Sequence, residues 1–198
     1  MSVQTPEPPA QFENRKRDHL RHSLDPLHQA IGQTGLEGVW MVHETLPDLD
    51  FSDVTIESHW FGQRLATPFY VAGMTAGHAD AAVLNLILAR ACVRRGWAFG
   101  VGSQRRELEG SQHWSEEWSL RGPESVFFAN FGISQVIRHA PSEAKKIIEN
   151  LGASAVAIHL NGLQEILQLE GTPQFRGGLA SIQRWVEELA PMPIIIKE

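Results

Sequence analysis

The chain has 198 residues and a formal net charge of −6, with 17 lysines and arginines against 23 aspartates and glutamates. This balance lacks the basic footprint of a general nucleic-acid-binding protein, and a single cysteine excludes both a disulfide framework and a Cys-x-x-Cys zinc site. No apolar run approaches the roughly 20 residues that span a bilayer, and the N-terminus lacks the apolar core of a secretion signal. We therefore expect a cytoplasmic protein with neither nucleic-acid nor membrane partners.

The sequence predicts a short tail at the N-terminus, followed by one domain. Residues 1–13 are rich in proline and carry no apolar periodicity, which is typical of a disordered tail. Residues 14–198 are assigned to a single domain. Within it, the pattern from Val39 to Leu65 favours short strands and turns, with one turn at Phe61-Gly62.

Five apolar runs of strand length follow. They are apolar throughout instead of alternating, which is typical of strands buried on both faces of a parallel sheet. Their starts lie about 29 residues apart, with a last interval of about 39, as in successive β-α units. The runs are Pro68–Ala72, Trp97–Val101, Val126–Phe131, Ala155–Leu160 and Ile194–Ile196. The sequence therefore predicts an α/β fold with five strands and helical crossovers.

Three of the intervening segments carry clear helix signals. An apolar stripe at helical spacing runs through residues 82–93 and is followed by Gly96, where a C′ glycine belongs. A second helix is predicted from Pro141 to Gly152, and a third over Leu179–Leu189. Because Cys92 lies within the first helix on an apolar background, we do not expect it to be a nucleophile.

Polar residues gather where the predicted strands end. The carboxyl ends of parallel strands meet at one edge of a sheet, which is where α/β proteins bind ligands. The residues at these ends are Gly73-Met74-Thr75-Ala76-Gly77, Ser103-Gln104-Arg105, Asn130, His159, Asn161, Gln164, Glu165 and Lys197. We expect them to form one ligand site.

Several of these residues also have a structural interpretation, which the sequence leaves open. Gly73 allows a tight turn as readily as the close approach of a cofactor, and Ser103 suits a helix N-cap. We favour a site role for Asn130, because an amide buried in an apolar run needs partners. His159 and Asn161 are two residues apart, so on a strand they would face the same side.

The charged candidates have two interpretations as well. The Arg15-Lys16-Arg17 cluster is either a solvated surface or a clamp for an anion. Lys197 either neutralises an anionic cofactor atom or extends its ammonium group into solvent. Glu165 is a single carboxylate, so it would hold Mg²⁺ only with waters and a substrate phosphate completing the coordination shell. No P-loop, complete Rossmann fingerprint, zincin motif or nucleophile elbow occurs.

Taken together, these segments resemble the type 2 isopentenyl-diphosphate isomerases, a family of flavoproteins with a TIM-barrel fold. The resemblance runs from Arg15 to the last residue, and its motifs are specific in this order and at these spacings. They are Arg15-Lys16, Leu46-Pro47-Asp48-Leu49-Asp50-Phe51, Ala72–Gly77, Gly100–Arg105, Ala129–Gly132, His159–Glu165 and Ile196-Lys197-Glu198. The implied fold class is α/β, a TIM (β/α)₈ barrel of which this chain carries the first five β/α strands.

The resemblance also implies an activity and its cofactors. Family members interconvert isopentenyl and dimethylallyl diphosphate in isoprenoid biosynthesis, with reduced FMN, Mg²⁺, and NADPH as the reductant of FMN. The implied substrate-binding residues are Arg15, Lys16, Ser103, Gln104, Arg105 and Gln164, and the implied catalytic residues are Gln164, His159 and Asn161. Gly73, Met74, Thr75, Ser103, Asn130 and Lys197 would bind FMN, and Glu165 would bind the metal. A homo-oligomer, a tetramer or octamer, is implied for the full-length family.

The chain departs from the family pattern in three places. Ala76 and Leu169 replace a usual glycine and a usual proline, and the family continues past Lys197-Glu198 with three more strands and loops that grip the FMN phosphate. We therefore expect a C-terminally truncated chain with poor FMN retention and little turnover. The alternatives are another FMN-dependent barrel oxidoreductase, of the 2-hydroxy acid oxidase type, or a non-catalytic truncated product.

Overall fold

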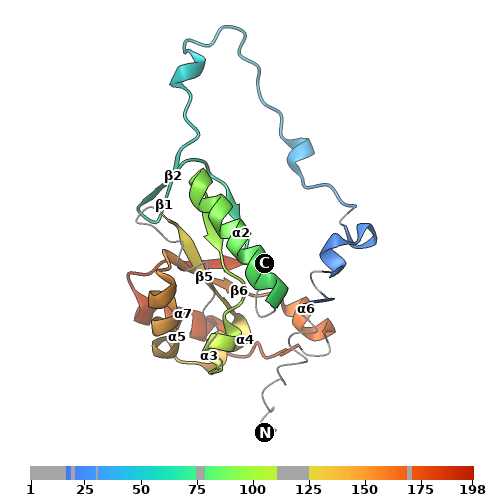
Figure 1. Ribbon diagram of the computed structural model, residues 1–198, viewed down its shortest axis with the longest axis vertical. Coiled ribbons are helices and arrows are strands. Elements are labelled where there is room, and N and C mark those ends of the chain that lie inside the picture. Colours follow the sequence, from blue (N-terminus) through green and yellow to red (C-terminus); the bar gives the residue numbers. More distant parts are fainter. Residues whose placement is uncertain (1–16, 19–20, 30, 75–78, 111–124, 169–170) are drawn as a thin grey trace.

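The computed structural model describes residues 17–18, 21–29, 31–74, 79–110, 125–168 and 171–198 (Figure 1). The predicted tail at residues 1–13 lies outside the described residues, as do Arg15, Lys16 and Thr75. No helix in the described ranges is long and apolar enough to cross a lipid bilayer.

The centre of the structure is a five-stranded parallel sheet in the order β3-β4-β5-β6-β7, so each strand pairs with its neighbour in sequence. Each strand lies inside the apolar run that predicted it or extends one residue beyond it, and the five strand predictions are confirmed. The strands are β3 (Tyr70–Val71), β4 (Ala98–Gly100), β5 (Phe127–Gly132), β6 (Ala155–His159) and β7 (Ile194–Lys197).

The predicted TIM (β/α)₈ barrel class is wrong for this chain. The five strands form an open sheet with β3 at one edge and β7 at the other, and no strand of the described ranges joins these edges. A separate two-stranded antiparallel sheet, β1 (Ser58–Trp60) and β2 (Gln63–Leu65), lies beside it. The prediction failed because barrel closure depends on pairing between the first and last strands, and local motifs do not encode that pairing.

The helices predicted from sequence are confirmed. Residues 82–93 lie within a longer helix, Pro141 occupies the first turn of another, and Gly152 ends that helix in the left-handed conformation with φ +62°. Glycine is favoured there because a Cβ disfavours positive φ. The helices are α2 (Ala79–Arg95), α3 (Arg105–Leu108), α4 (Ile133–Arg138), α5 (Pro141–Leu151), α6 (Gly162–Leu167) and α7 (Gly178–Leu189).

One face of the sheet is covered by helices and forms the main hydrophobic core. Trp185 of α7 is fully buried and packs edge-to-face on Phe131 of β5, with ring centroids 5.4 Å apart. The core also contains Phe99, Phe127, Val156 and Ile158 of the strands and Cys92, Val136, Ile148 and Leu151 of the helices. Alternation along each strand sends the remaining side chains to the opposite face.

The opposite face is covered at its amino-terminal end by the β1–β2 hairpin. Leu65 of β2 packs with Ala98, Val126, Phe128 and Ala155 in a second, smaller core. The hairpin turns at the predicted Phe61-Gly62, where both residues have positive φ (+52° and +78°), as the commonest two-residue hairpin turn requires.

The last strand differs from its prediction. The three isoleucines of β7 predict a strand buried on both faces, yet β7 is an edge strand and the Ile196 side chain is 47% exposed. An apolar run shows that a strand is apolar, but it does not show whether the strand pairs with one neighbour or with two. The run alone therefore does not distinguish an edge strand from a central one.

The chain before the sheet is extended. Residues 31–57 are exposed throughout, although they include Trp40 and Phe51, which are 89% and 93% exposed. Figure 1 shows this segment as a long loop that reaches away from the sheet. Two short 3₁₀ helices, η2 (Leu36–Gly38) and η3 (Phe51–Asp53), interrupt it, and a third, η1 (Pro26–His28), precedes it.

Candidate functional site

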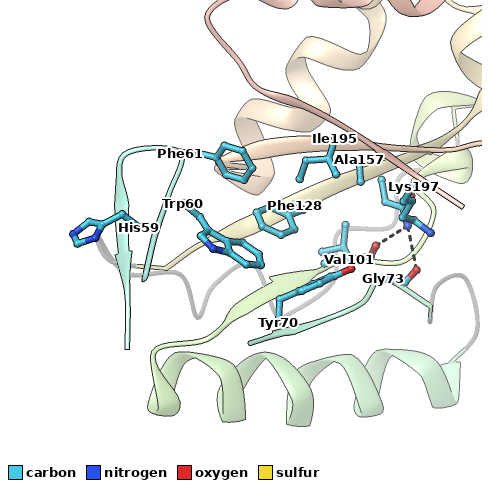
Figure 2. Close-up of a pocket in the computed structure, with 12 residues that line it drawn as sticks. His59, Trp60, Phe61, Tyr70, Gly73, Val101, Phe128, Ala157, Ile195 and Lys197 are labelled. Atoms are coloured by element: carbon cyan, nitrogen blue, oxygen red, sulfur yellow. Dashed lines mark hydrogen bonds between the residues drawn. The ribbon is translucent and has the colours of Figure 1, made fainter. Parts of the chain in front are cut away.

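The face of the sheet opposite the helices carries a pocket of about 420 Å³, a volume within the range of small-molecule sites. Figure 2 shows its aromatic side chains at one end and Lys197 with Gly73 at the other. The pocket is lined by His59, Trp60, Phe61, Tyr70, Gly73, Gly100, Val101, Phe128, Asn130, Ala157, Ile195 and Lys197. Gly73, Asn130 and Lys197, three of the residues that the resemblance implies for FMN, thus lie in one pocket.

The apolar end of the pocket is a cluster of four rings. Trp60 stacks on Phe128 with centroids 6.1 Å apart and an interplanar angle of 11°. Tyr70 and Phe61 lie 6.0 Å and 5.8 Å from the same Phe128 ring. These separations are those of favourable aromatic pairs, so Trp60 and Phe61 pack the hairpin against Phe128 of the sheet and form an apolar wall of the pocket.

Asn130 forms the polar centre of the pocket. Its Nδ2 donates hydrogen bonds to the carbonyl oxygens of Gly73, at 3.2 Å, and Val101, at 3.0 Å (dashed in Figure 2). The side chain is only 3% exposed, which confirms the prediction of a buried amide with partners. Its Oδ1 is also buried but accepts no hydrogen bond from the described residues. Because an unsatisfied buried acceptor is costly, a ligand N–H or O–H at this point would be stabilising.

Gly73 brings the end of β3 close to the end of β4. A Cβ at Gly73 would collide with the carbonyl oxygen of Val101. The absence of a side chain therefore allows Asn130 to reach both carbonyl groups. The neighbouring Met74, also predicted to bind the cofactor, is 70% exposed and is not among the pocket residues.

Lys197 and His159 lie side by side at the carboxyl end of the sheet. They are partners in the β6–β7 register, and His159 is also the partner of Gly132 in β5. Lys197 Nζ contacts the carboxylate of Glu198. The imidazole of His159 lies against Gly132, where a Cβ would come within 3.0 Å of its Nε2. His159 is half-buried and lies outside the pocket lining.

Asn161 and Gln164 lie together at the start of α6. Asn161 Oδ1 accepts a hydrogen bond from the Gln164 backbone N–H at 3.2 Å, and Asn161 Nδ2 donates to Gln164 Oε1. The prediction that Asn161 shares a strand face with His159 is wrong, because β6 ends at His159 and Asn161 is the N-cap of α6. The side-chain oxygen of Asn161 satisfies an otherwise unpaired helix N–H.

Glu165, the predicted metal ligand, also lies on α6 and is half-buried. Its Oε2 accepts a hydrogen bond from the backbone N–H of Thr172 at 2.7 Å. No group of three or more histidine, cysteine, aspartate or glutamate side chains with metal-binding geometry occurs within the part of the chain that is described.

The Ser103-Gln104-Arg105 segment presents little of itself to solvent. Arg105 is 8% exposed, and its Nε donates to Glu109 Oε1 at 2.9 Å. The Gln104 side chain is 2% exposed. Gln104, and not Ser103, is the N-cap residue of α3, so the N-cap interpretation of Ser103 is wrong. Ser103 is half-buried beside it.

The aromatic wall of the pocket was not predicted from the sequence. A signal for it was present, because Phe128 lies two positions before Asn130 on one predicted strand and must face the same side. The contribution of Trp60 was not readable from sequence in the same way. It depends on how the hairpin folds against the sheet.

Comparison with known proteins gives a consistent set of names. No protein-family model matches the chain. It is 44% identical over 196 residues to a protein from Bdellovibrio bacteriovorus, and 43% identical over 191 residues to one from Legionella pneumophila. In both comparisons 96% of this chain and 56% of the relative are covered. A protein from Ignicoccus hospitalis is 38% identical over 191 residues, covering 93% of this chain and 52% of the relative.

Each of these relatives is named isopentenyl-diphosphate delta-isomerase. The names state neither an isomerase type nor a cofactor. The chain spans about half the length of the curated relatives that it matches. The resemblance to isopentenyl-diphosphate isomerases is therefore confirmed at the level of the isomerase name, over nearly the whole of this chain.

Proposed function

We propose that this chain contributes substrate- and cofactor-binding residues to an isopentenyl-diphosphate delta-isomerase of isoprenoid biosynthesis. Identity of 44% to a relative of that name supports the proposal. The structural observation that carries it is the pocket in which Gly73, Asn130 and Lys197 meet, with the buried Asn130 Oδ1 lacking a partner among the described residues.

We further propose the flavin-dependent, type 2 reaction with FMN, Mg²⁺, and NADPH as the reductant. The pocket suits a flat ring with one polar edge, because an aromatic wall faces a buried acceptor and a cation. Asn130 Oδ1 would accept a hydrogen bond from a ring N–H, and Lys197 would stabilise a negative charge on the ring. Reduced FMN, when bound, would supply the acid–base group for the double-bond shift.

The other residues would hold the substrate. The shift of a double bond adds a proton to one carbon and removes one from another, so positive charge develops and water must be excluded. Gln164 and His159 would lie at the reacting carbons, with Asn161 holding Gln164 in place. Arg15 and Lys16 would bind the diphosphate together with Ser103 and Arg105.

Glu165 would complete the diphosphate site. A single carboxylate is sufficient for Mg²⁺ when phosphate oxygens and waters occupy the remaining positions of the octahedron. The hydrogen bond from the Thr172 N–H to Oε2 fixes the orientation of the carboxylate. Glu165 would then be the one ligand that the described residues supply to the metal ion.

The test is isomerisation by a chimera in which this chain replaces the matching part of the Bdellovibrio bacteriovorus relative. With FMN, NADPH and Mg²⁺, we expect the chimera to convert isopentenyl diphosphate to dimethylallyl diphosphate. Asn130→Ala and Glu165→Gln should each lower kcat/KM at least tenfold, and Glu165→Gln should also change the Mg²⁺ dependence. A folded chimera without isomerisation, beside an active relative, would contradict the proposed function.

A further inference from the structure

Gln104 continues the hydrogen-bond ladder between β4 and β5 beyond the end of β4. Val101 N donates to Phe128 O at 3.1 Å, which is a regular step between neighbouring strands. Further along, Gln104 N donates to Asn130 O at 2.8 Å, and Asn130 N donates to Gln104 Oε1 at 3.2 Å. The side-chain oxygen of Gln104 thus takes the place of the carbonyl that a regular β4 would supply to Asn130.

This pair fixes the residue at the centre of the pocket. With its backbone N–H and C=O both held by Gln104, Asn130 directs its Nδ2 to the carbonyl oxygens of Gly73 and Val101. Three segments are joined in this way: the ends of β3 and β4 and the middle of β5. All of these bonds are made within the protein, and the Gln104 and Asn130 side chains are 2% and 3% exposed.

We propose that Gln104 is a positioning residue for Asn130 and not a ligand of the substrate diphosphate. Its side chain is already engaged through Oε1 and, unlike that of Asn130, it is not among the residues that line the pocket. Its Nε2 is buried and has no partner among the described residues, so the acceptor oxygen is the group that acts. The consequence for FMN rests on the proposed function, whereas the effect on Asn130 does not.

The chain itself tests the positioning role by amide hydrogen exchange and ¹⁵N NMR. Gln104→Met keeps the length of the side chain and removes the acceptor, whereas Gln104→Glu retains an acceptor oxygen. We expect Gln104→Met to raise the exchange rate of the Asn130 backbone N–H at least tenfold and to shift its Nδ2 resonances, with partial rescue by Gln104→Glu. Gln104→Asn, polar but one methylene too short, should act like Gln104→Met if the latter does not fold.

Unchanged exchange and resonances at Asn130 in a folded Gln104→Met or Gln104→Asn chain would overturn the proposal. The proposal would also be overturned if a Gln104 variant bound isopentenyl diphosphate more weakly while the exchange rate and resonances of Asn130 stayed unchanged. Gln104 would then be a substrate ligand.

FMN titration then separates the two proposals. If FMN binds, Gln104→Met should weaken FMN binding about tenfold in a chain that retains Asn130. The same substitution should have no effect on FMN binding in an Asn130→Ala background, because the effects of coupled residues do not add. Equal weakening in both backgrounds would contradict action through Asn130. A change at Asn130 without FMN binding by the chimera would support the positioning role and count against the flavin assignment.

Discussion

The two faces of the five-stranded sheet come from the same strands, yet they are built for different tasks. On the helix-covered face, Phe131 is fully buried against Trp185. One residue earlier, Asn130 points to the other face and lines a pocket with a polar end. Because successive side chains of a strand alternate, a single strand can supply the core with one residue and a binding site with the next.

The difference between the faces follows from what covers them. Helices α2, α4, α5 and α7 exclude water from one face and leave no need for polar side chains there. The hairpin covers only the amino-terminal part of the other face. Polar groups at the uncovered carboxyl end are therefore available to a ligand, and we expect substitutions on the two faces to separate stability from binding.

The largest effect is expected for Trp185→Ala on the helix-covered face. Removing a fully buried tryptophan should lower the free energy of unfolding by about 3–5 kcal/mol. Urea denaturation followed by circular dichroism measures this loss. The control is Leu179→Ala on the same helix, which is 83% exposed and should cost less than about 0.5 kcal/mol. Equal losses for the two variants would contradict the assignment of the core to this face.

A second effect on the same face is expected at alkaline pH. Burial raises the pKa of the Cys92 thiol to about 11, above its value in the unfolded chain. The resulting stability is complete below the unfolded pKa of about 9 and is lost as pH rises through the folded value. Between pH 9 and 11 the native chain should lose about 2 kcal/mol more than Cys92→Ala does. If the native chain and Cys92→Ala gave parallel pH profiles of unfolding free energy, the prediction would be wrong and the thiol would be accessible to water.

The helix-covered face was also the part of the fold that the sequence predicted well. Continuous apolar runs located β5 and β6 to within a residue, and Pro141 and Gly152 marked both ends of α5. These are local signals, in which the residues that specify an element lie within it. Barrel closure and the exposure of β7 depend instead on which strands become neighbours, and there the prediction failed.

The pocket face was predicted in part. Of the residues at the strand ends, Gly73, Asn130 and Lys197 line one pocket, whereas Met74 and His159 lie outside its lining. The role of Gln104 was not accessible, because its bond to Asn130 joins residues 26 positions apart. Whether a polar side chain at a strand end points outward or back into the protein is decided by such long-range contacts.

A smaller effect, confined to binding, is expected for Lys197→Met on the pocket face. Lys197 lies at the end of an edge strand, so the free energy of unfolding should change by less than about 0.5 kcal/mol. In the chimera, the proposed flavin site predicts that FMN affinity falls about tenfold, equivalent to about 1.4 kcal/mol, as measured by quenching of flavin fluorescence. Lys145→Met on the exposed side of α5 is the matched control and should leave both quantities unchanged. If Lys197→Met instead lowered the free energy of unfolding strongly and left FMN affinity unchanged, this end of the pocket face would contribute to stability and not to binding.

The smallest effect is expected for Glu143→Gln at the start of α5, on the helix-covered side. Hydrogen bonds from His139 Nδ1, at 3.0 Å, and the Ala140 N–H, at 2.7 Å, lower the pKa of Glu143. The stabilisation is therefore present above the unfolded pKa, about 4.3, and is lost as pH falls through the lower folded value. Since the carboxylate is exposed, the loss at pH 7 should stay below about 1 kcal/mol.

Unfolding free energies measured from pH 7 to pH 3 test this prediction, with Glu188→Gln on the exposed side of α7 as the control. The difference between Glu143→Gln and the native chain should shrink toward pH 3, as the carboxylate of Glu143 becomes protonated. A difference that is the same at both pH values would mean that Glu143 acts through packing alone. The charge of Glu143 would then contribute nothing to the stability of α5, in contrast to the electrostatic role proposed for Lys197 on the pocket face.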